Sequence, residues 1–208
     1  MLLTKIAIFY MFVLCNPHRI CKYLKKSKRS NILETLYYYN PVNKDSHTEF
    51  CRNLETLLTE YNASHREIVV ICIGSDRATG DCLGPLVGEK LSKEGCVVSV
   101  YGTLASPVHA VNLLETLKKI RELHDNPLII AVDASLGMRR HVGYVTLKKG
   151  SLRPGSGVSK TLPLIGDICI TGIVGVSGLL NDVLLQTTRL HLVMQLSDFI
   201  SDGIKEIS

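Results

Sequence analysis

The stretch from Glu67 to Asp81, EIVVICIGSDRATGD, is the most informative part of this 208-residue chain. Its first half, Glu67 to Ile73, is rich in β-branched residues and predicts a short strand buried on both faces. Its second half, Gly74 to Asp81, is a polar loop, and the apolar residues after it predict a helix that continues to about Lys93. A buried strand, a polar loop and a helix in this order are typical of the crossover units of parallel α/β sheets.

Strands and helices continue to alternate along the chain. Apolar runs predict four further strands: Val97–Tyr101, Leu128–Val132, Val142–Leu147 and Ile168–Val174. Helical spacing predicts three further helices: Thr48–Tyr61, Val108–Leu123 and about Leu179–Ile200. We expect the strand that begins at Val142 to form a hairpin with the strand before it or to lie at an edge beside it. The pattern predicts one doubly wound α/β domain over residues 46–208, with a mainly parallel sheet and helices on both faces.

Residues 1–45 have a different character. Met1–Cys15 is almost entirely apolar, and a basic stretch, His18–Arg29, follows it. The apolar run is short for a membrane-spanning helix, which needs about 20 residues, and a signal peptide would carry its positive charge before the apolar core. Three interpretations are open: a short membrane anchor, a disordered extension, or a start assigned too far upstream. We favour the last two and expect no stable membrane insertion.

Composition narrows the function classes. The net charge is only +5, there is no Trp, and Phe occurs 4 times, which argues against a dedicated nucleic-acid-binding domain. The 7 cysteines include no Cys-x-x-Cys pair, so neither zinc-finger spacing nor the dense disulfide framework of a small secreted protein is present. We therefore expect a reducing, cytoplasmic location.

The loops at the strand ends, where open α/β sheets bind their ligands, do not match three well-known motifs. Gly74 and Gly80 are separated by five residues, and Asp81 stands where a phosphate-binding loop has Lys. The dinucleotide fingerprint lacks its second Gly. The sequence around Ser177, GVSGL, departs from the Gly-x-Ser-x-Gly elbow of serine hydrolases. Nucleotide binding and serine hydrolysis are thus disfavoured.

Two acids are the strongest candidate site. Asp81 and Asp133 each follow a predicted buried strand, and two carboxyl groups brought together tend to share one proton. The charged acid can then activate water while the protonated one polarises a carbonyl, as in aspartic-type amide hydrolysis. The structural alternative is that Asp81 caps the following helix and Asp133 binds backbone amides.

Several segments of the chain resemble known families. Three resemble the germination protease of bacterial spores: GSDRATGDCLGP at 74–85, IAVDA at 130–134 and PGSGV at 154–158. Five more are similar to the YyaC sporulation proteins: Tyr101–Leu104, Pro107–Ala110, Gly166–Asp167, Thr171–Val174 and Thr188–Leu192. Together the motifs extend from about Ile68 to Gly203 in matching order.

This resemblance implies a phosphorylase/hydrolase-like fold, as in hydrogenase maturation proteases. It places the two active aspartates of an atypical aspartic peptidase at Asp81 and Asp133. It implies a spore protein or peptide as substrate, with small acid-soluble spore proteins as candidates. In the hydrogenase proteases the first acid is a glutamate and a histidine helps to hold nickel. Here the first acid is an aspartate and no histidine matches that role, so we expect neither a metal nor another cofactor.

Five polar residues are supporting or substrate-binding candidates. Asp76 and Thr79 share the loop of the first acid and would orient it, unless they are ordinary turn residues. Ser135 lies two residues after the second acid, within reach of its carboxylate. His109 begins a predicted helix, where capping or core packing is the main alternative to catalysis. Asp167 precedes the last strand and is the least favoured of the five.

Our leading hypothesis is an aspartate-dependent peptidase of sporulation or germination. The main alternative is a catalytically silent protein that uses the same fold to bind a spore protein or peptide. The third is a metal-dependent processing peptidase. The loop Gly150–Leu162 fits either a peptide-binding lid or an ordinary surface loop.

Overall fold

The computed structural model describes residues 23–26, 33–93, 95–154, 162–178 and 181–207. The strands within these ranges are β1 (Tyr23–Lys26), β2 (Leu33–Tyr39), β3 (Ile68–Cys72), β4 (Ser99–Tyr101), β5 (Leu128–Gly137), β6 (Val145–Lys149) and β7 (Ile168–Val176). The α-helices are α2 (Lys44–Glu60), α3 (Leu83–Lys93), α4 (Leu113–Leu123), α5 (Asn181–Gln186) and α6 (Leu190–Lys205). Two 3₁₀ turns, Ala63–His65 and Arg139–His141, complete the described elements.

The strands form one sheet in the order β1-β2-β6-β7-β5-β3-β4. The pairs β3–β4, β3–β5 and β5–β7 are parallel, whereas β6 pairs antiparallel with both β7 and β2. It follows that β2, β3, β4, β5 and β7 run in one direction and β1 and β6 run in the other. The expected α/β sheet, mainly parallel, is confirmed.

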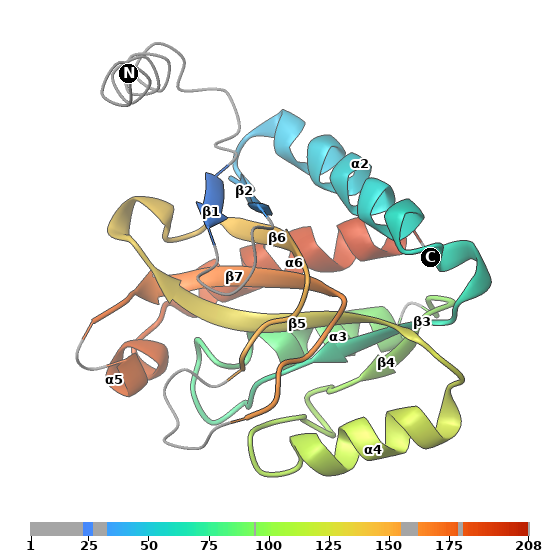
Figure 1. The fold of residues 1–208 in the computed structure, drawn as a ribbon. Coiled ribbons are helices and arrows are strands. Elements are labelled where there is room, and N and C mark those ends of the chain that lie inside the picture. The colour runs from blue at the N-terminus through green and yellow to red at the C-terminus, as the bar shows by residue number, and fades with distance from the viewer. Residues whose placement is uncertain (1–22, 27–32, 94, 155–161, 179–180, 208) are drawn as a thin grey trace.

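Helices cover both faces of this sheet, as predicted (Figure 1). Successive residues of β3 point to opposite sides: Val70 and Cys72 join a core with α2, α3 and α6, while Val69 and Ile71 join a second core with α4. All four side chains are fully buried. A strand that is apolar at every position is what a sheet covered on both faces requires.

Two predicted elements differ from the structure in more than their bounds. The strand β6 pairs with β2 and β7 rather than with β5, because β7 occupies the position beside β5. The single helix predicted from about Leu179 to Ile200 is two helices, α5 and α6, which are separated at Thr187–Arg189. The hydroxyl of Thr188 bonds the Leu184 carbonyl, and Gly80 packs against the same turn, so a contact distant in sequence fixes the break.

The described structure includes strands before residue 46. Tyr39 at the end of β2 is 1% exposed, pairs with Val145 and contacts the ring of Phe50, so β2 contributes to the sheet and to the core. The stretch treated as an extension therefore includes a strand of the domain. The predicted apolar run Met1–Cys15 and part of the loop Gly150–Leu162 lie outside the described residues. Within the described ranges, no helix is long and apolar enough to cross a membrane.

Candidate active site

The carboxyl ends of β3 and β5 bring the two predicted acids to the same edge of the sheet. The backbone N–H of Ile73, just after β3, donates to the Val132 carbonyl at 2.8 Å, which places the start of the Asp81 loop beside Asp133. Gly74 then turns back with φ of +143°, a conformation that L side chains rarely adopt. Topology thus joins residues that are about 50 positions apart in the sequence.

The Asp81 loop is packed closely at both ends. A Cβ on Gly74 would lie 2.0 Å from the Asp81 carbonyl oxygen, and the Ser75 N–H donates to that same oxygen at 3.2 Å. At the other end, the Gly80 N–H donates to the Leu185 carbonyl in α5 at 2.7 Å. These backbone contacts fix the position of Asp81 without involving its side chain.

Asp133 occupies an environment that favours its neutral form. The residue is only 8% exposed, and its Oδ1 accepts a hydrogen bond of 2.8 Å from the Ala134 N–H. Burial raises the pKa of Asp133 well above its ordinary value, and the charge of nearby Asp81 raises it further. The second acid therefore keeps its proton when the first has ionised.

Asp81 is also affected by burial, but two groups oppose the effect. Burial raises the pKa of Asp81, while a backbone hydrogen bond from Ser75 and the electrostatic influence of His109 lower it. His109 lies nearby because Val108 forms a parallel bridge with Ile73. Its Nδ1 accepts the Val111 N–H at 3.3 Å, so in neutral His109 the proton lies on Nε2. The two acids thus have different environments, as a shared-proton pair requires.

A row of hydroxyl groups continues from Asp133 across the sheet. Thr171 of β7 is the register partner of Asp133 on one side and of Thr146 on the other, and the two threonine hydroxyls are 2.7 Å apart. The Ser135 hydroxyl lies 3.0 Å from that of Thr171 and 3.4 Å from the Gly172 carbonyl oxygen. A hydrogen bond between Ser135 and Thr171, on the neighbouring strand β7, therefore replaces the expected bond between Ser135 and Asp133.

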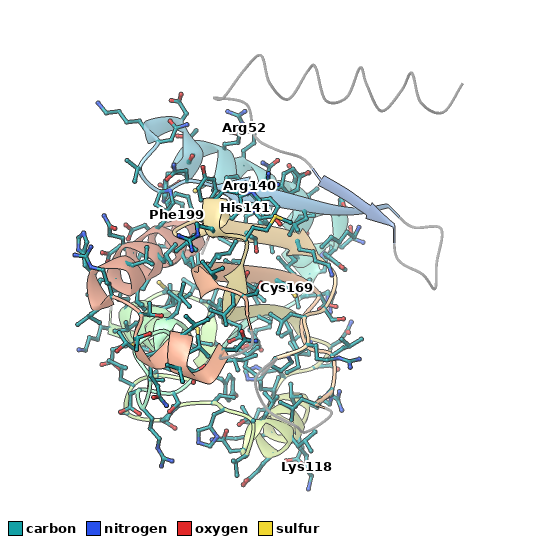
Figure 2. All side chains as sticks on the ribbon, turned by 90° about the vertical axis from the view of Figure 1, so that its left-hand side faces the viewer. Arg52, Lys118, Arg140, His141, Cys169 and Phe199 are labelled. Carbon is teal, nitrogen blue, oxygen red and sulfur yellow. The ribbon has the colours of Figure 1, made fainter. Side chains whose placement is uncertain are left out.

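A groove of about 540 Å³ follows this row toward the outer strands. Its lining includes Ser135 and Thr171, the neighbours of Asp133, and ends near Tyr38 and Arg140. Figure 2 places Arg140 and His141 beside β2, with Cys169 deeper in the sheet. The groove thus runs from the outer strands to Ser135 and Thr171, the neighbours of Asp133, and a volume of this size is typical of small-molecule sites.

The remaining predicted residues have other roles. Asp76 is exposed in the loop, and the backbone carbonyl of Thr79 accepts a hydrogen bond from the Cys82 thiol. Asp167 accepts the Ile129 N–H at 3.1 Å and pairs with Arg66 at 3.4 Å. It precedes Thr171 by four residues, about 13 Å along a strand at ~3.3 Å per residue. Asp167 is therefore at the opposite end of the sheet and does not belong to the acid pair.

The residues around the acid pair do not form a metal cluster. Within the part of the chain that the structure describes, the only group of three His, Cys or acidic side chains whose ligand atoms converge is elsewhere in the fold, between α2 and α6. Asp81, Asp133 and His109 do not meet the same criterion. We therefore derive no metal-dependent step at this site.

Comparisons with known proteins identify the family of this chain. Residues 38–203 match a family model described as a protein of unknown function, DUF1256. The chain belongs to the DUF1256 family. An uncharacterized protein of Bacillus subtilis (strain 168), YyaC, is 47% identical over 164 residues, which cover 76% of this chain and 80% of that protein. A [NiFe] hydrogenase maturation protease, HycI from Thermococcus kodakarensis, overlays with a TM-score of 0.46 at 20% identity, covering 68% of this chain and 91% of that one.

The DUF1256 match contains both acids, His109 and the hydroxyl row. Thr146 and Thr171 were not among the residues selected from the sequence. Thr171 was visible as a polar residue in an otherwise apolar strand, which is the signal that could have identified it. Thr146 gives no such signal, because only the pairing of β6 with β7 places it beside Thr171.

Proposed function

We propose that this chain is an aspartate-dependent peptidase in which Asp81 and Asp133 act as a pair on a spore protein or peptide during sporulation or germination. The observation that carries the proposal is the placement of both acids at one edge of the sheet, where the Ile73 N–H donates to the Val132 carbonyl at 2.8 Å and the Asp81 loop begins beside buried Asp133. Perturbed pKa values at the carboxyl edge of an α/β sheet are typical of functional sites. The motifs shared with the germination protease support the same two residues.

The acids would divide the chemistry of amide hydrolysis. Ionised Asp81 takes a proton from water, and the water oxygen attacks the carbonyl carbon of the scissile bond. Protonated Asp133 donates its proton to the carbonyl oxygen, which stabilises the tetrahedral intermediate. Asp81 then gives the proton that it took from water to the amide nitrogen as the C–N bond breaks. Asp133 takes back a proton from a hydroxyl of the intermediate, so a carboxylic acid and an amine leave and both acids return to their starting states. His109 would favour the ionised state of Asp81.

The groove supports an extended segment of polypeptide as substrate. It offers hydroxyls of Ser135, Thr146 and Thr171 beside apolar residues such as Leu136 and Ile173. Such a mixture can bind both the backbone and the side chains of a peptide. Small acid-soluble spore proteins are the first candidates, since the germination protease that degrades them shares with this chain the motifs around Asp81 and Asp133.

The test uses the full chain, because β2 contributes Tyr39 to the core. The wild type and Asp81→Asn are incubated with a small acid-soluble spore protein from acid to neutral pH, and products are identified by mass spectrometry. We expect discrete cuts by the wild type only, over a pH range in which one acid is ionised and the other protonated. Wild-type cleavage by the variant would rule out the pair. An intact substrate with stable binding would favour the silent binding protein.

A further inference from the structure

Three side chains outside the acid pair meet between α2 and the end of α6. His47 and Cys51 are at positions i and i+4 of α2 and share one face of the helix. The His47 Nδ1 lies 3.8 Å from the Cys51 Sγ and 3.6 Å from the Glu206 Oε1, and all three ligand atoms lie within 4.8 Å of one another. We propose that His47, Cys51 and Glu206 bind one divalent cation of the zinc class, which ties the end of α6 to α2.

The distances suit a tetrahedral zinc ion. With Zn–S near 2.3 Å and Zn–N and Zn–O near 2.1 Å, the edges of the tetrahedron are about 3.6 Å for S···N and about 3.4 Å for N···O. The corresponding separations here are 3.8 and 3.6 Å. The two separations from the His47 Nδ1 therefore need to shorten by only about 0.2 Å to reach bonding geometry, and the Cys51 Sγ and the Glu206 carboxylate, within 4.8 Å of each other, would close around the ion.

The donor set selects the same class of metal. Thiolate and imidazole favour zinc over magnesium or calcium, which prefer oxygen ligands. A thiolate and a carboxylate also supply two negative charges, which balance the charge of a divalent cation. Water would complete four-coordination, as at zinc sites with three protein ligands.

The packing of α2 on α6 holds the ligands in place. A Cβ on Gly203 of α6 would lie 2.4 Å from the Phe50 ring and 3.7 Å from the Cys51 Sγ, so this glycine permits the close approach of the two helices. Phe199, which Figure 2 labels on α6, packs edge-on against the His47 ring at 5.4 Å between centroids. Cys51 is 6% exposed whereas the Glu206 side chain is 57% exposed, which leaves an entry path for the ion.

Hydrogen bonding alone accounts poorly for this cluster. The His47 Nε2 is buried and has no hydrogen-bond partner among the described residues, so the polar partners of this ring lie on its Nδ1 side. An ion on Nδ1 is a stronger partner than the 3.8 Å contact with a thiol. Burial and Glu206 raise the pKa of Cys51 to about 12, so metal binding must displace the thiol proton into solvent.

The site is independent of the proposed peptidase. It is in the core formed by α2, α3 and α6, whereas Asp133 lies on the opposite face of the sheet, toward α4. Its test consequently needs no substrate. The full chain is purified under reducing conditions, stripped with a chelator and titrated with Co²⁺, whose spectrum reports thiolate ligation. Zn²⁺ is then added to displace the cobalt.

We expect one equivalent of Co²⁺ to bind with a thiolate-to-cobalt charge-transfer band, and Zn²⁺ to raise the melting temperature. Cys51→Ser removes the band. Glu206→Gln weakens the affinity by at least about tenfold. Because Glu206 is exposed, this variant tests the site even if Cys51→Ser fails to fold.

The matched control is Glu55→Gln, which makes the same charge change one turn after Cys51 and should leave the affinity within about twofold. A Cys15→Ser/Cys21→Ser double variant should retain the band, because neither thiol is one of the three proposed ligands. Three results would overturn the proposal: no stoichiometric cobalt, a band that survives in Cys51→Ser, or equal affinity in Glu206→Gln and the wild type.

Discussion

Two aspartates belong to the same pair of parallel strands, and their surroundings have opposite effects. Asp167, at the amino end of β7, receives the Ile129 N–H and the guanidinium of Arg66. Asp133, toward the carboxyl end of β5, is buried beside a second carboxyl, Asp81, and its pKa is raised. The first environment supplies a backbone donor and a cation, whereas the second is buried and contains another acid.

We expect this difference to separate a structural acid, Asp167, from the proposed reactive acid, Asp133. A carboxylate with a cation and a backbone donor stabilises the fold as an anion. A buried acid next to another acid lowers the stability of the fold. Such acids are most common at functional sites, where the reaction needs a group in an uncommon protonation state. Each prediction below tests whether this contrast between the two ends of the sheet is real.

The largest expected effect is on cleavage by Asp133→Asn. If Asp133 is the proton donor, its amide replacement should lower kcat by about 10²–10⁴-fold, because removal of a general acid has this effect. Asp167→Asn makes the same chemical change at the other end of the same strands. Its kcat should fall by much less than about 10²-fold, which is the lower limit of that range. Equal losses in the two variants, with both folded, would mean that the contrast has no catalytic meaning.

The next effect is on stability, where the two variants should move in opposite directions. Asp133→Asn removes a buried acid and should raise the free energy of unfolding at neutral pH by about 0.5–2 kcal/mol, as the relief of a destabilised active site does. Asp167→Asn weakens the acceptor of a backbone donor and of a charged side chain, and should cost about 1–3 kcal/mol. Urea denaturation of each variant measures both values.

The pH dependence of folding stability tests why Asp133→Asn should stabilise the protein. An acid whose folded pKa is raised holds its proton in the folded state after the unfolded chain has lost it, so stability falls as pH rises above the ordinary Asp value of about 3.9. The gain from Asp133→Asn should therefore be absent in acid, grow with pH and level off above the folded pKa. A gain that is constant with pH would mean that burial of this acid is not the cause.

A smaller effect concerns the coupling of the two acids. Asp81→Asn removes a like charge, so the pKa of Asp133 should fall but stay above its ordinary value, since burial is the larger cause. NMR titration of carbon-labelled aspartate carboxyls measures the shift directly, with Asp76→Asn as the control because Asp76 is the exposed acid of the same loop. An unchanged Asp133 would show that the two carboxyls do not interact.

The sequence predicted most of the fold because β3, β5 and β7 are buried on both faces and their apolar runs are continuous. It also predicted both acids, since the carboxyl ends of parallel strands share one edge. It placed the start of α4 at Val108, but α4 begins at Leu113 because Val108 bridges to Ile73. Periodicity along one segment cannot reveal such a distant backbone pairing.

The features that the sequence missed depend on distant contacts in the same way. Ser135 was assigned to Asp133 on spacing alone, yet the adjacent strand supplies a closer partner in Thr171. His47 and Cys51 have helical spacing, but their convergence with Glu206 requires the packing of α6 on α2. Local patterns predict elements and strand ends, whereas the partner of each side chain depends on which strands and helices become neighbours.

The smallest effect we predict is that of His109→Gln, and it refines the contrast between the two ends of the sheet. Asp167 has a permanent cation in Arg66, whereas Asp81 has a histidine whose charge depends on pH. Removing that charge should raise the pKa of Asp81 and move the acid limb of the cleavage profile to higher pH. The rate should fall a few-fold on the acid side, where an imidazole is charged, and change little at higher pH, where an imidazole is neutral. A uniform loss across the profile would instead make His109 a direct participant in catalysis, and the wild-type profile would leave its bond to the Val111 N–H as its only role.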